Sequence, residues 1–497
     1  MTKRQTAMYR RNYRKKLQIK FFSFLQEGHF VLTACLLFSP PVFAQQKPIV
    51  PNPSSKSIDQ KQQPTNGQVS ASPKPISAIY VETNGNDANS GRSGASALRT
   101  IQRAVDIAQP GDTILVGPGT YQNKNIWTGD YVADITKAGR ADAWITIRSR
   151  ENHKAVLSSN GWSVVKFGGG AAYWNIEDFE VVGSAEQITL DYALSQKDIA
   201  NPLTNGNGIF ADGRKSTRKP RHITVRNNIV HDTSGCGICT VQADYLTIEG
   251  NTVYDTSHYA RYATSGIDLF QMWNTDSNSG YKNIIRNNFV YRNESYVPWE
   301  ATGKISDGNG IIIDDFRHTQ NGSTGTPYLG RTLVINNIST LNGGSGMHAY
   351  FSDKVDFMNN IAYHNSRSPD LDYPEIFASE ASDVRIINNI IVPRSDGSVT
   401  SKPSSNGRTN VLFDYNIFFG KPLVEFSLNN NKQIDPLYSV NEASPLLSMF
   451  RPSPQFTGWI DAGLELGDVR LGGVYPPDFD GGVRPKGLTP DIGPFEK

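Results

Sequence analysis

The sequence predicts an all-β fold, a parallel β-solenoid, and three observations support this prediction. Six times between Ile209 and Asn389, an apolar start is followed by a β-rich run that ends in Asn. The shortest copies take 13 residues from the start Ile238 to Asn251 and 10 residues from Asn228 to the next start. A period of about 23 residues is long enough for three short strands and three turns, which make one coil of a solenoid. Charged residues make up only 19% of the chain, and its 44 glycines suit many tight turns.

The repeat also predicts which side chains face the core. Counting the Ile or Met of each start as position zero, positions 0 and +2 are almost all apolar, and strands alternate faces, so these side chains should point inward. The starts are Ile209, Ile238, Ile267, Ile311, Met347 and Ile376. The Asn that ends each run should stack in a ladder at a turn, with its amide bonded from coil to coil. These residues are Asn228, Asn251, Asn288, Asn337, Asn360 and Asn389.

The N-terminus is predicted to be a targeting segment that lies outside the fold. Residues 1–44 combine eight Lys and Arg, an apolar stretch over 30–38 and the pattern Val42-Phe43-Ala44, which together are typical of a secretory signal peptide. The apolar stretch is too short to span a bilayer, so we expect a secreted or extracytoplasmic protein without stable membrane insertion. A lipoprotein signal with Cys35 as the lipidated residue is an alternative. Residues 45–76, rich in Pro, Ser, Gln, Lys and Asn, are predicted to be a disordered linker.

Cleavage of this segment changes the charge of the protein. Residues 1–44 hold eight of the 49 Lys and Arg and one of the 47 Asp and Glu, so 41 basic and 46 acidic residues remain, a net charge of −5. A nucleic-acid-binding protein would normally carry a basic stripe, and the sequence has none, so we expect no nucleic-acid partner. Only Cys236 and Cys239 remain after cleavage. One such pair inside a repeat is a weak signal for metal or redox chemistry, and we expect apolar packing or, at most, a local disulfide.

The ordered region is predicted to be a β-helix over residues 77–432 with an N-terminal helical cap. An irregular segment over 433–497 should pack on the solenoid. A cap is needed because the first coil of a solenoid exposes its apolar end, and the helical spacing over 97–108 provides it. Strands are predicted at 79–81, 113–116, 144–147, 155–157 and 173–176, with 411–416 as a fading last coil.

Both ends of the ordered region carry recognisable sequence. The stretch from Ile79 to Tyr121 begins Ile-Tyr-Val-Glu-Thr-Asn-Gly-Asn-Asp and ends Pro-Gly-Asp-Thr-Ile-Leu-Val-Gly-Pro-Gly-Thr-Tyr. Asp435-Pro436-Leu437 and Asp491-Ile492-Gly493-Pro494 lie near the C-terminus. These texts resemble the N-terminal cap and the C-terminal ends of right-handed parallel β-helix proteins of the pectate-lyase-like superfamily. The resemblance covers about residues 79–497 and implies the right-handed fold, whereas activity varies among lyases, hydrolases, epimerases and proteins of unknown role.

The outward positions +1 and +3 are where chemistry can lie on a solenoid face. Across successive coils, +1 holds Phe210, Cys239, Asp268, Ile312, His348 and Phe377, and +3 holds Asp212, Val241, Phe270, Asp314, Tyr350 and Ser379. Adjacent strands are about 4.8 Å apart, so one polar patch should form over three coils. Its members are Asp268, Asp314, Asp315, His348 and Tyr350. The longest insertions, 23 residues from Asn288 to Ile311 and 26 from Ile311 to Asn337, fall on the same coils and should wall a cleft.

Three neighbouring carboxylates repel one another unless a positive charge lies between them. Ca²⁺ binds six to eight oxygens, and we expect Asp268, Asp314 and Asp315 to bind it. The ion would neutralise the carboxylate of a uronate substrate and acidify its C5 proton, which a nearby base would remove in a β-elimination. The alternative is that Asp314 and Asp315 end a strand and cap a turn on a solvated face.

The residues around this patch also resemble polysaccharide lyase family 9. That family has an Asp-rich coil followed by a Gly-x-Gly-apolar-Lys coil that bears the base. Ser265-Gly266-Ile267-Asp268 keeps the last carboxylate of such a motif, and Gly344-Ser345-Gly346-Met347-His348 places His348 where the Lys would stand. The resemblance therefore implies a lyase in which His348 is the base. Lys304, Arg317 and His318, on the insertions, are alternative bases or partners of the substrate carboxylate.

Aromatic side chains are frequent around the predicted cleft, and sugar rings stack on such faces. Tyr350, Phe270 and Trp273, with His318 beside them, are the candidates for substrate contact. The leading hypothesis is a monomeric secreted enzyme that cleaves an acidic, uronate-containing polysaccharide as a Ca²⁺-dependent lyase. Two alternatives are glycoside hydrolysis, with the same three aspartates as acid and base, and a non-catalytic surface protein that only binds glycans.

Overall fold

The computed structural model describes residues 77–123, 129–395, 409–420 and 430–497, which all lie within one compact unit, Ser72–Lys497. The predicted signal peptide, the lipidation alternative at Cys35 and the linker over 45–76 lie outside the described residues. Within the described ranges, no helix is both long enough and apolar enough to cross a lipid bilayer.

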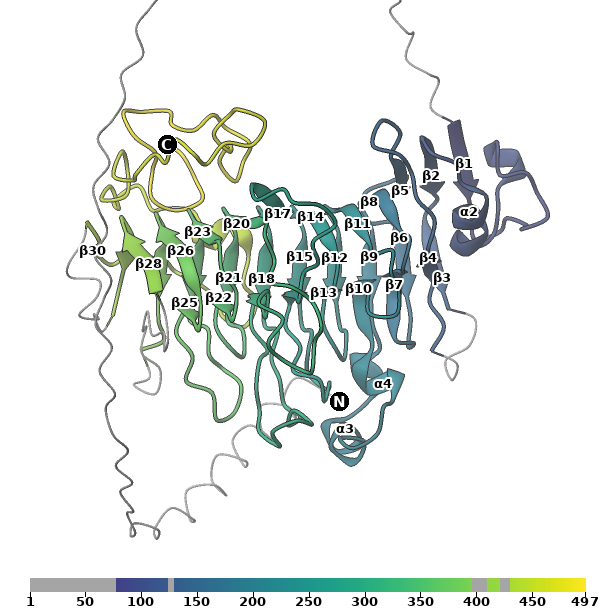
Figure 1. Cartoon of the computed structure of the whole chain (residues 1–497), viewed down its shortest axis with the longest axis horizontal. Helices are drawn as coiled ribbons and strands as arrows, with labels where there is room; N and C mark the ends of the chain where they lie inside the picture. The colour runs from purple at the N-terminus through teal and green to yellow at the C-terminus, as the bar shows by residue number, and fades with distance from the viewer. Residues whose placement is uncertain (1–76, 124–128, 396–408, 421–429) are drawn as a thin grey trace, which may run out of the picture. The chain divides into compact units, whose positions relative to one another are not determined.

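The described chain forms a parallel β-helix of three sheets, which confirms the predicted fold class (Figure 1). The first sheet contains β1 (Ser77–Val81), β2 (Asp112–Val116), β5 (Ile145–Ser149), β8 (Ala172–Glu177), β11 (Arg221–Arg226), β14 (Asp244–Glu249), β17 (Tyr281–Arg286), β20 (Arg331–Ile335), β23 (Val355–Met358), β26 (Ser382–Ile387) and β28 (Thr409–Asp414). The second contains β3 (Gly119–Gln122), β6 (Ala155–Ser158), β9 (Glu180–Val182), β12 (Ile229–His231), β15 (Thr252–Tyr254), β18 (Phe289–Tyr291), β21 (Ile338–Thr340), β24 (Ile361–Tyr363), β27 (Ile390–Val392), β29 (Ile417–Phe418) and β30 (Lys432–Gln433). The third contains β4 (Ala133–Ile135), β7 (Ser163–Phe167), β10 (Asn207–Asp212), β13 (Ile238–Val241), β16 (Ile267–Phe270), β19 (Ile311–Asp314), β22 (Met347–Tyr350) and β25 (Ile376–Ser379).

The predicted inward positions lie in the core of the solenoid. Every residue at positions 0 and +2 of the six repeats is buried, from Ile209 and Ala211 to Ile376 and Ala378. From β8 to β27, successive strands join the first, second and third sheets in turn, so equivalent residues of neighbouring coils stack in register. This register decides which residues share a face.

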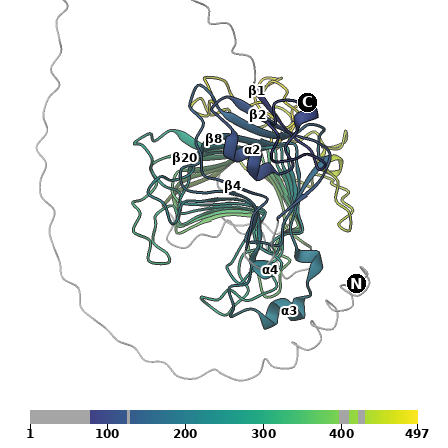
Figure 2. The same ribbon diagram turned by 90° about the vertical axis from the view of Figure 1, so that its right-hand side faces the viewer.

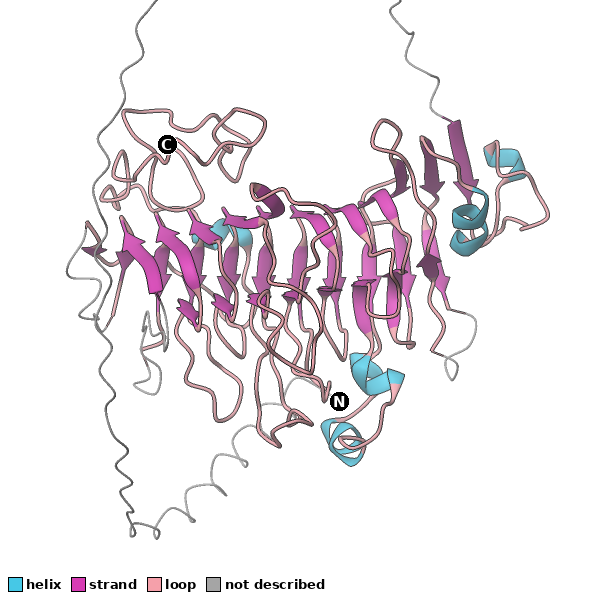
Figure 3. Ribbon diagram, in the orientation of Figure 1, coloured by secondary structure: helices cyan, strands magenta, loops and turns pink. Residues whose placement is uncertain are grey.

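The helical cap is present but shorter than its sequence pattern suggested. Helix α2 (Ile101–Ile107) begins after Thr100, whose Oγ1 accepts the N–H of Arg103 at 3.2 Å. Leu98 lies before the helix because it forms a β-bridge with Val81. The helix lies beside β1 at the end of the solenoid (Figure 3). The other helices of the described residues are η1 (Gly94–Ser96), η2 (Ala185–Gln187), α3 (Leu190–Ser195), α4 (Pro202–Asn205) and η4 (Leu447–Phe450).

The predicted Asn ladder is present and extends further than the repeat suggested. Each side chain donates an Nδ2–H to the Oδ1 of the Asn one coil on, at 2.9–3.1 Å, and that Oδ1 also accepts a backbone N–H. The row continues past Asn389 through Asn416 to Asn431. All six predicted members are buried. The ladder therefore links the coils through paired amides and buries no charge.

A second row of Asn side chains lies beside the ladder and binds the C-terminal segment. Each of these residues directly precedes a ladder Asn and has a positive φ; they are Asn287, Asn336, Asn359 and Asn388. Asn336 Nδ2 donates to Pro477 O at 2.7 Å, and Asn388 Nδ2 donates to Leu464 O at 2.9 Å. In the same segment, Phe450 and Trp459 belong to an apolar cluster with residues of the second sheet. The Asn-Asn pairs of the sequence thus serve two purposes, one inside the coil and one outside.

Candidate functional site

The outward face of the third sheet carries the predicted columns in the predicted register. Asp268 on β16 pairs with Ile312 on β19, which pairs with His348 on β22. In the column two residues on, Phe270, Asp314 and Tyr350 are paired in the same way. Asp268 and Asp314 therefore occupy diagonal positions on adjacent strands, where Cβ atoms are about 7 Å apart. This juxtaposition of residues 46 apart in sequence is confirmed.

Long connections leave the third sheet at both ends of its strands. Those that precede β16, β19 and β25 project together with α3 and α4 from one side of the solenoid, as two views show (Figures 1 and 2). They include the predicted insertion before β19, and the insertion that follows β19 covers residues 315–330. Two hollows in the described surface lie elsewhere, one beside Trp459 and one beside Phe289, so the predicted cleft is not among them.

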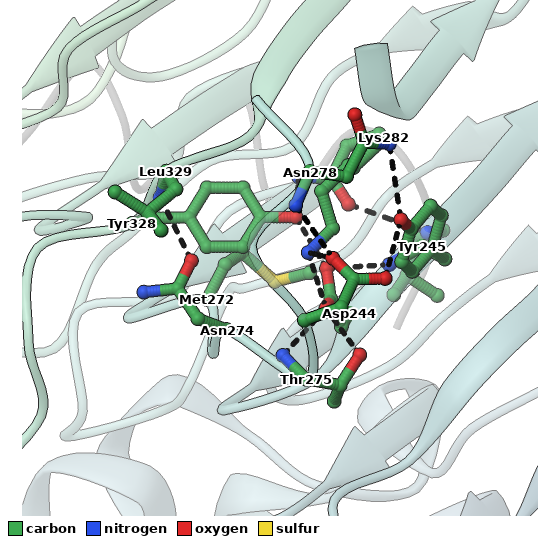
Figure 4. A network of polar contacts seen from close by, with 12 residues as sticks. Asp244, Tyr245, Met272, Asn274, Thr275, Asn278, Lys282, Tyr328 and Leu329 are labelled. Atoms are coloured by element: carbon green, nitrogen blue, oxygen red, sulfur yellow. Dashed lines mark hydrogen bonds and ion pairs between the residues drawn. The ribbon is translucent and has the colours of Figure 1, made fainter. Parts of the chain in front are cut away.

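A buried polar network fixes the connection that follows β19 (Figure 4). Lys282 Nζ lies 2.7 Å from Asp244 Oδ2, and both side chains are inaccessible to solvent. Tyr328 of the insertion donates its hydroxyl to Asp244 Oδ1 at 2.5 Å, and Thr275 donates its N–H and hydroxyl to Oδ2. Loss of Lys282 would leave the buried carboxylate of Asp244 without a paired charge. The network therefore holds residues 315–330 against β14 and fixes where the residues near Asp314 lie.

Three carboxyl groups interact on this face, and two of them were predicted. Burial raises the pKa of Asp268 well above its usual range, and the charge of Asp307 raises it further. Burial also raises the pKa of Asp314, with the charges of Asp268 and Asp307 adding to the effect. Asp268 Oδ1 is buried and accepts no hydrogen bond from the described residues. The group therefore needs a proton or a cation to be stable.

Asp307 is the member that sequence reasoning missed. Burial raises its pKa to about 6, while hydrogen bonds from Ser306 and Asn309 act in the opposite direction. It lies in the insertion before β19 and belongs to neither outward column. The Gly-x-Gly motif that precedes several starts could have indicated this position in the sequence, because Asp307 directly precedes Gly308-Asn309-Gly310.

His348 lies on the same face as a buried, neutral ring. Its imidazole stacks on Phe377 with ring centres 4.4 Å apart, and Tyr373 meets it edge-on at 6.3 Å. Burial lowers the pKa of His348 to about 3. Its Nδ1 lies 2.7 Å from Ser345 Oγ. The predicted base is therefore uncharged at neutral pH, and burial weakens it as a proton acceptor.

Asp315 is placed differently from its prediction as a metal ligand. It is fully buried beyond the end of β19, with a φ of 49°. Its Oδ1 accepts the N–H and hydroxyl of Thr319, and its Oδ2 accepts Gln271 Nε2 and the N–H of Gln320, all at 2.7–2.8 Å. Both oxygens are thus occupied by the turn, as the capping alternative anticipated, although the side chain is buried and not on a solvated face. We therefore remove Asp315 from the metal-binding set.

The three basic candidates are not brought to the carboxylates. Arg317 forms a two-bond pair with Asp353, at 2.6 and 2.9 Å. Lys304 is exposed on the insertion and forms no ion pair within the described ranges. His318 has both ring nitrogens engaged, by Met272 O at 2.7 Å and Ser323 Oγ at 2.8 Å. In this conformation Arg317 and His318 are engaged by other partners, and Lys304 forms no ion pair with Asp268 or Asp314.

The aromatic candidates divide into two groups. Phe270 and Tyr350 flank Asp314 in its column and remain half-buried. Burial raises the pKa of Tyr350, and the charge of Asp314 adds to the shift. Trp273 already holds Lys219 Nζ over its ring at 4.3 Å and meets His318 edge-on. Phe270 and Tyr350 are therefore the better placed for substrate contact.

Cys236 and Cys239 are joined in a disulfide, the local bridge that the sequence left open. Cys239 lies directly beside Asp268 in the outward column. The bridge therefore fixes the turn before β13 at the edge of the carboxylate group.

Comparison with known proteins identifies relatives of this architecture. A family model described as Pel9A-like, right-handed beta helix region matches residues 79–378. Among solved structures, pectate lyase Pel9A has 16% sequence identity over 85% of this chain and 98% of its own, with a TM-score of 0.47. XylC in complex with xylose has 12% identity over 84% and 98%, with a TM-score of 0.42, and a rhamnogalacturonan lyase has 12% over 76% and 97%, with 0.44. No curated protein sequence matches significantly.

Proposed function

Because this chain belongs to the family of Pel9A-like right-handed β-helix proteins, we propose that it is a secreted enzyme that cleaves an acidic polysaccharide by β-elimination. The observation that carries this proposal is the carboxyl group Asp268–Asp307–Asp314 on the outward face of the third sheet. Each pKa in the group is raised by burial, and one buried oxygen has no partner in the described residues. Such a group is costly to maintain for stability alone and suits a charged ligand.

The unpartnered oxygen of Asp268 fits a cation bound between the aspartates. The described residues contain no group of three or more His, Cys, Asp or Glu side chains placed to hold a metal by themselves. We therefore propose that Asp268 and Asp314 would hold Ca²⁺ together with oxygens of the substrate. Bound Ca²⁺ would supply the positive charge that neutralises a uronate carboxylate and acidifies its C5 proton.

His348 is the base in this proposal. Its ring is neutral, and its free nitrogen would accept the C5 proton. As the C5–H bond breaks, a C4–C5 double bond forms and the C4–O bond to the next sugar breaks. The leaving oxygen takes its proton from solvent. Phe270 and Tyr350 would pack against the sugar rings on either side of Asp314.

A panel of uronate polymers tests the proposal directly. The full chain is incubated with polygalacturonate, alginate and glycosaminoglycans, with Ca²⁺ or with a chelator, and ultraviolet absorbance of unsaturated ends is followed. We expect Ca²⁺-dependent product on one class of polymer, lost in Asp314→Asn and His348→Gln. Asp142→Asn, on an exposed side chain, is the matched control. The absence of unsaturated product on every polymer would contradict the proposal.

Glycoside hydrolysis is the second candidate, and one observation favours it. A carboxyl with a pKa of about 6, as at Asp307, is suited to act as a general acid beside a second carboxylate. In that case the same panel would yield reducing ends without unsaturated product, and chelation would leave the rate unchanged. Binding without any turnover would instead indicate a glycan-binding surface protein.

A further inference from the structure

We infer that Asn309 and Ser345 are positioning residues that hold His348 as its Nδ1–H tautomer, so that Nε2 is the atom offered to a substrate. The catalytic meaning of this inference rests on the proposed lyase function. The hydrogen-bond chain itself, Asp307–Asn309–Ser345–His348, does not depend on that function.

The orientation of the Asn309 amide is fixed by its neighbours. The backbone N–H of Ser345 points to one end of the amide at 2.8 Å, and a backbone N–H can only donate, so this end is Oδ1. The opposite end, Nδ2, donates to Asp307 Oδ1 and to Ser265 Oγ, both at 3.0 Å. Asn309 and Ser345 are fully buried, so water does not compete with these bonds.

The hydroxyl of Ser345 then decides the tautomer of His348. Ser345 Oγ lies 3.2 Å from Asn309 Oδ1, which can only accept, and 2.7 Å from His348 Nδ1. If the hydroxyl donates to Asn309, Nδ1 must carry a proton and donate to Oγ. Both hydrogens are then used, and Nε2 keeps a free lone pair.

The opposite tautomer gives up one hydrogen bond of the chain. If the Ser345 hydroxyl donated to Nδ1 instead, it would lose its bond to Asn309, and Nε2 would carry an N–H. Within the described residues, Nε2 of His348 has no hydrogen-bond partner, and the ring is packed between Phe377 and Tyr373. The Nδ1–H form keeps the bond from the Ser345 hydroxyl to Asn309 Oδ1, worth about 0.5–1.5 kcal/mol, so this form is favoured.

The other histidine of this region provides a contrast. His318 also bonds a serine at Nδ1, through Ser323 Oγ at 2.8 Å, but its Nε2 is bonded to Met272 O. It has no ring nitrogen left for a substrate. The two Ser–His pairs are therefore chemically alike but differ in the atom that they leave available, and Ser323 provides a matched control.

The chain of bonds also links His348 to the carboxyl group. Asp307, which receives Asn309 Nδ2, is the same residue whose charge contributes to the raised pKa of Asp268 and Asp314. The hydrogen-bond chain that orients the base thus ends on a member of the carboxyl group. Aligning the outward strand positions of the repeats did not reveal this link, because Asn309 and Ser345 precede the strands and lie inside the Gly-x-Gly motifs.

Nitrogen-15 spectra of the full chain labelled at histidine test the inference without any substrate. The two ring nitrogens of a neutral histidine differ in their two-bond correlations to the ring carbon protons, and the His348 signals are assigned by their loss in His348→Gln. We expect the Nδ1–H pattern at neutral pH. Ser345→Ala should shift His348 toward a mixture of tautomers, whereas Ser323→Ala should leave it unchanged. An Nε2–H or imidazolium pattern in the unmodified protein would overturn the inference, whether or not a variant folds.

Kinetics on the susceptible polymer add a second readout. Ser345→Ala and Asn309→Ala should lower kcat on the order of ten- to hundredfold, as loss of an orienting partner commonly does, with KM nearly unchanged. Ser323→Ala should keep both constants. If no uronate polymer is cleaved, the proposed function fails and the spectra still decide the tautomer. If cleavage occurs but Ser345→Ala retains the full kcat, the positioning role is wrong.

Discussion

The Asn ladder and the outward face of the third sheet both stack polar side chains from coil to coil, yet they differ in how those groups are satisfied. In the ladder, each amide is neutral, and each donor and acceptor has a partner at 2.9–3.1 Å. On the outward face, Asp268 Oδ1 has no partner among the described residues, and charges of one sign lie together. A polar residue repeated in every coil stabilises the fold. A polar residue present in only one or two coils of its column indicates a site.

An intermediate case lies at the turn that follows the strands of the second sheet. Asn293, Asn342 and Asn365 form a second buried ladder, which ends at the carboxylate of Glu375. Burial raises the pKa of Glu375 to about 8, and the hydrogen bonds from Asn365 oppose this shift. An amide ladder that ends in an acid should therefore combine the stability of the first region with the pH sensitivity of the second.

The largest expected effect comes from breaking the Asn ladder. Asn337→Ala removes the acceptor for the N–H and Nδ2 of Asn288 and the donor to Ile285 O and Asn360 Oδ1. We expect a loss of about 4 kcal/mol in the free energy of unfolding, because several buried groups lose partners at once. Urea unfolding followed by circular dichroism measures it.

Asn227, which directly precedes the ladder residue Asn228, provides a control for this prediction. Asn227 also has a positive φ, and its side chain bonds to Asp178 near the surface. Glycine suits that backbone conformation, so Asn227→Gly should cost about 1 kcal/mol or less. Equal losses in the two variants would show that the ladder is not the stabilising element we describe.

Glu375→Gln should stabilise the protein by about 2 kcal/mol at pH 8. Between pH 4.5 and about 8 the folded state keeps the Glu375 proton that the unfolded chain has lost, so stability falls as pH rises through this window. Glutamine keeps one of the two oxygens that accept hydrogen bonds from Asn365, and it removes the titration. Thermal unfolding from pH 4 to pH 8 should therefore give a flatter profile for the variant. If the stability of both proteins fell equally with pH, Glu375 would not be the buried acid that causes the pH dependence.

Asp314→Asn should give a smaller stabilisation, about 1 kcal/mol at neutral pH without Ca²⁺. The raised pKa of Asp314 means that the folded state binds a proton more tightly than the unfolded chain, so the carboxyl destabilises the fold increasingly above its ordinary pKa. Asparagine keeps an acceptor for Gln320 Nε2, which lies 3.0 Å from Oδ1. The same substitution should abolish turnover. A destabilisation like that of Asn337→Ala would place Asp314 with the structural residues.

The sequence predicted what depends on the coil period and missed what depends on loops and turns. Asp268, Asp314 and His348 were placed on one face correctly because strand alternation and register follow from the repeat. Asp315 was placed wrongly because β19 ends at Asp314 and the left-handed backbone of the next residue turns its side chain into the insertion. Asp307 was missed because insertions have no period to align.

Calcium binding to the full chain tests the central claim most directly. Calorimetric titration of Ca²⁺ in the presence of a uronate oligomer should show saturable binding to the unmodified protein and to Asp142→Asn, with no binding to Asp268→Asn or Asp314→Asn. Binding should also raise the melting temperature, since a ligand that binds only the folded state stabilises it. Equal binding by all four proteins, or binding by none of them, would contradict the assignment of Asp268 and Asp314 as the cation site of this β-helix.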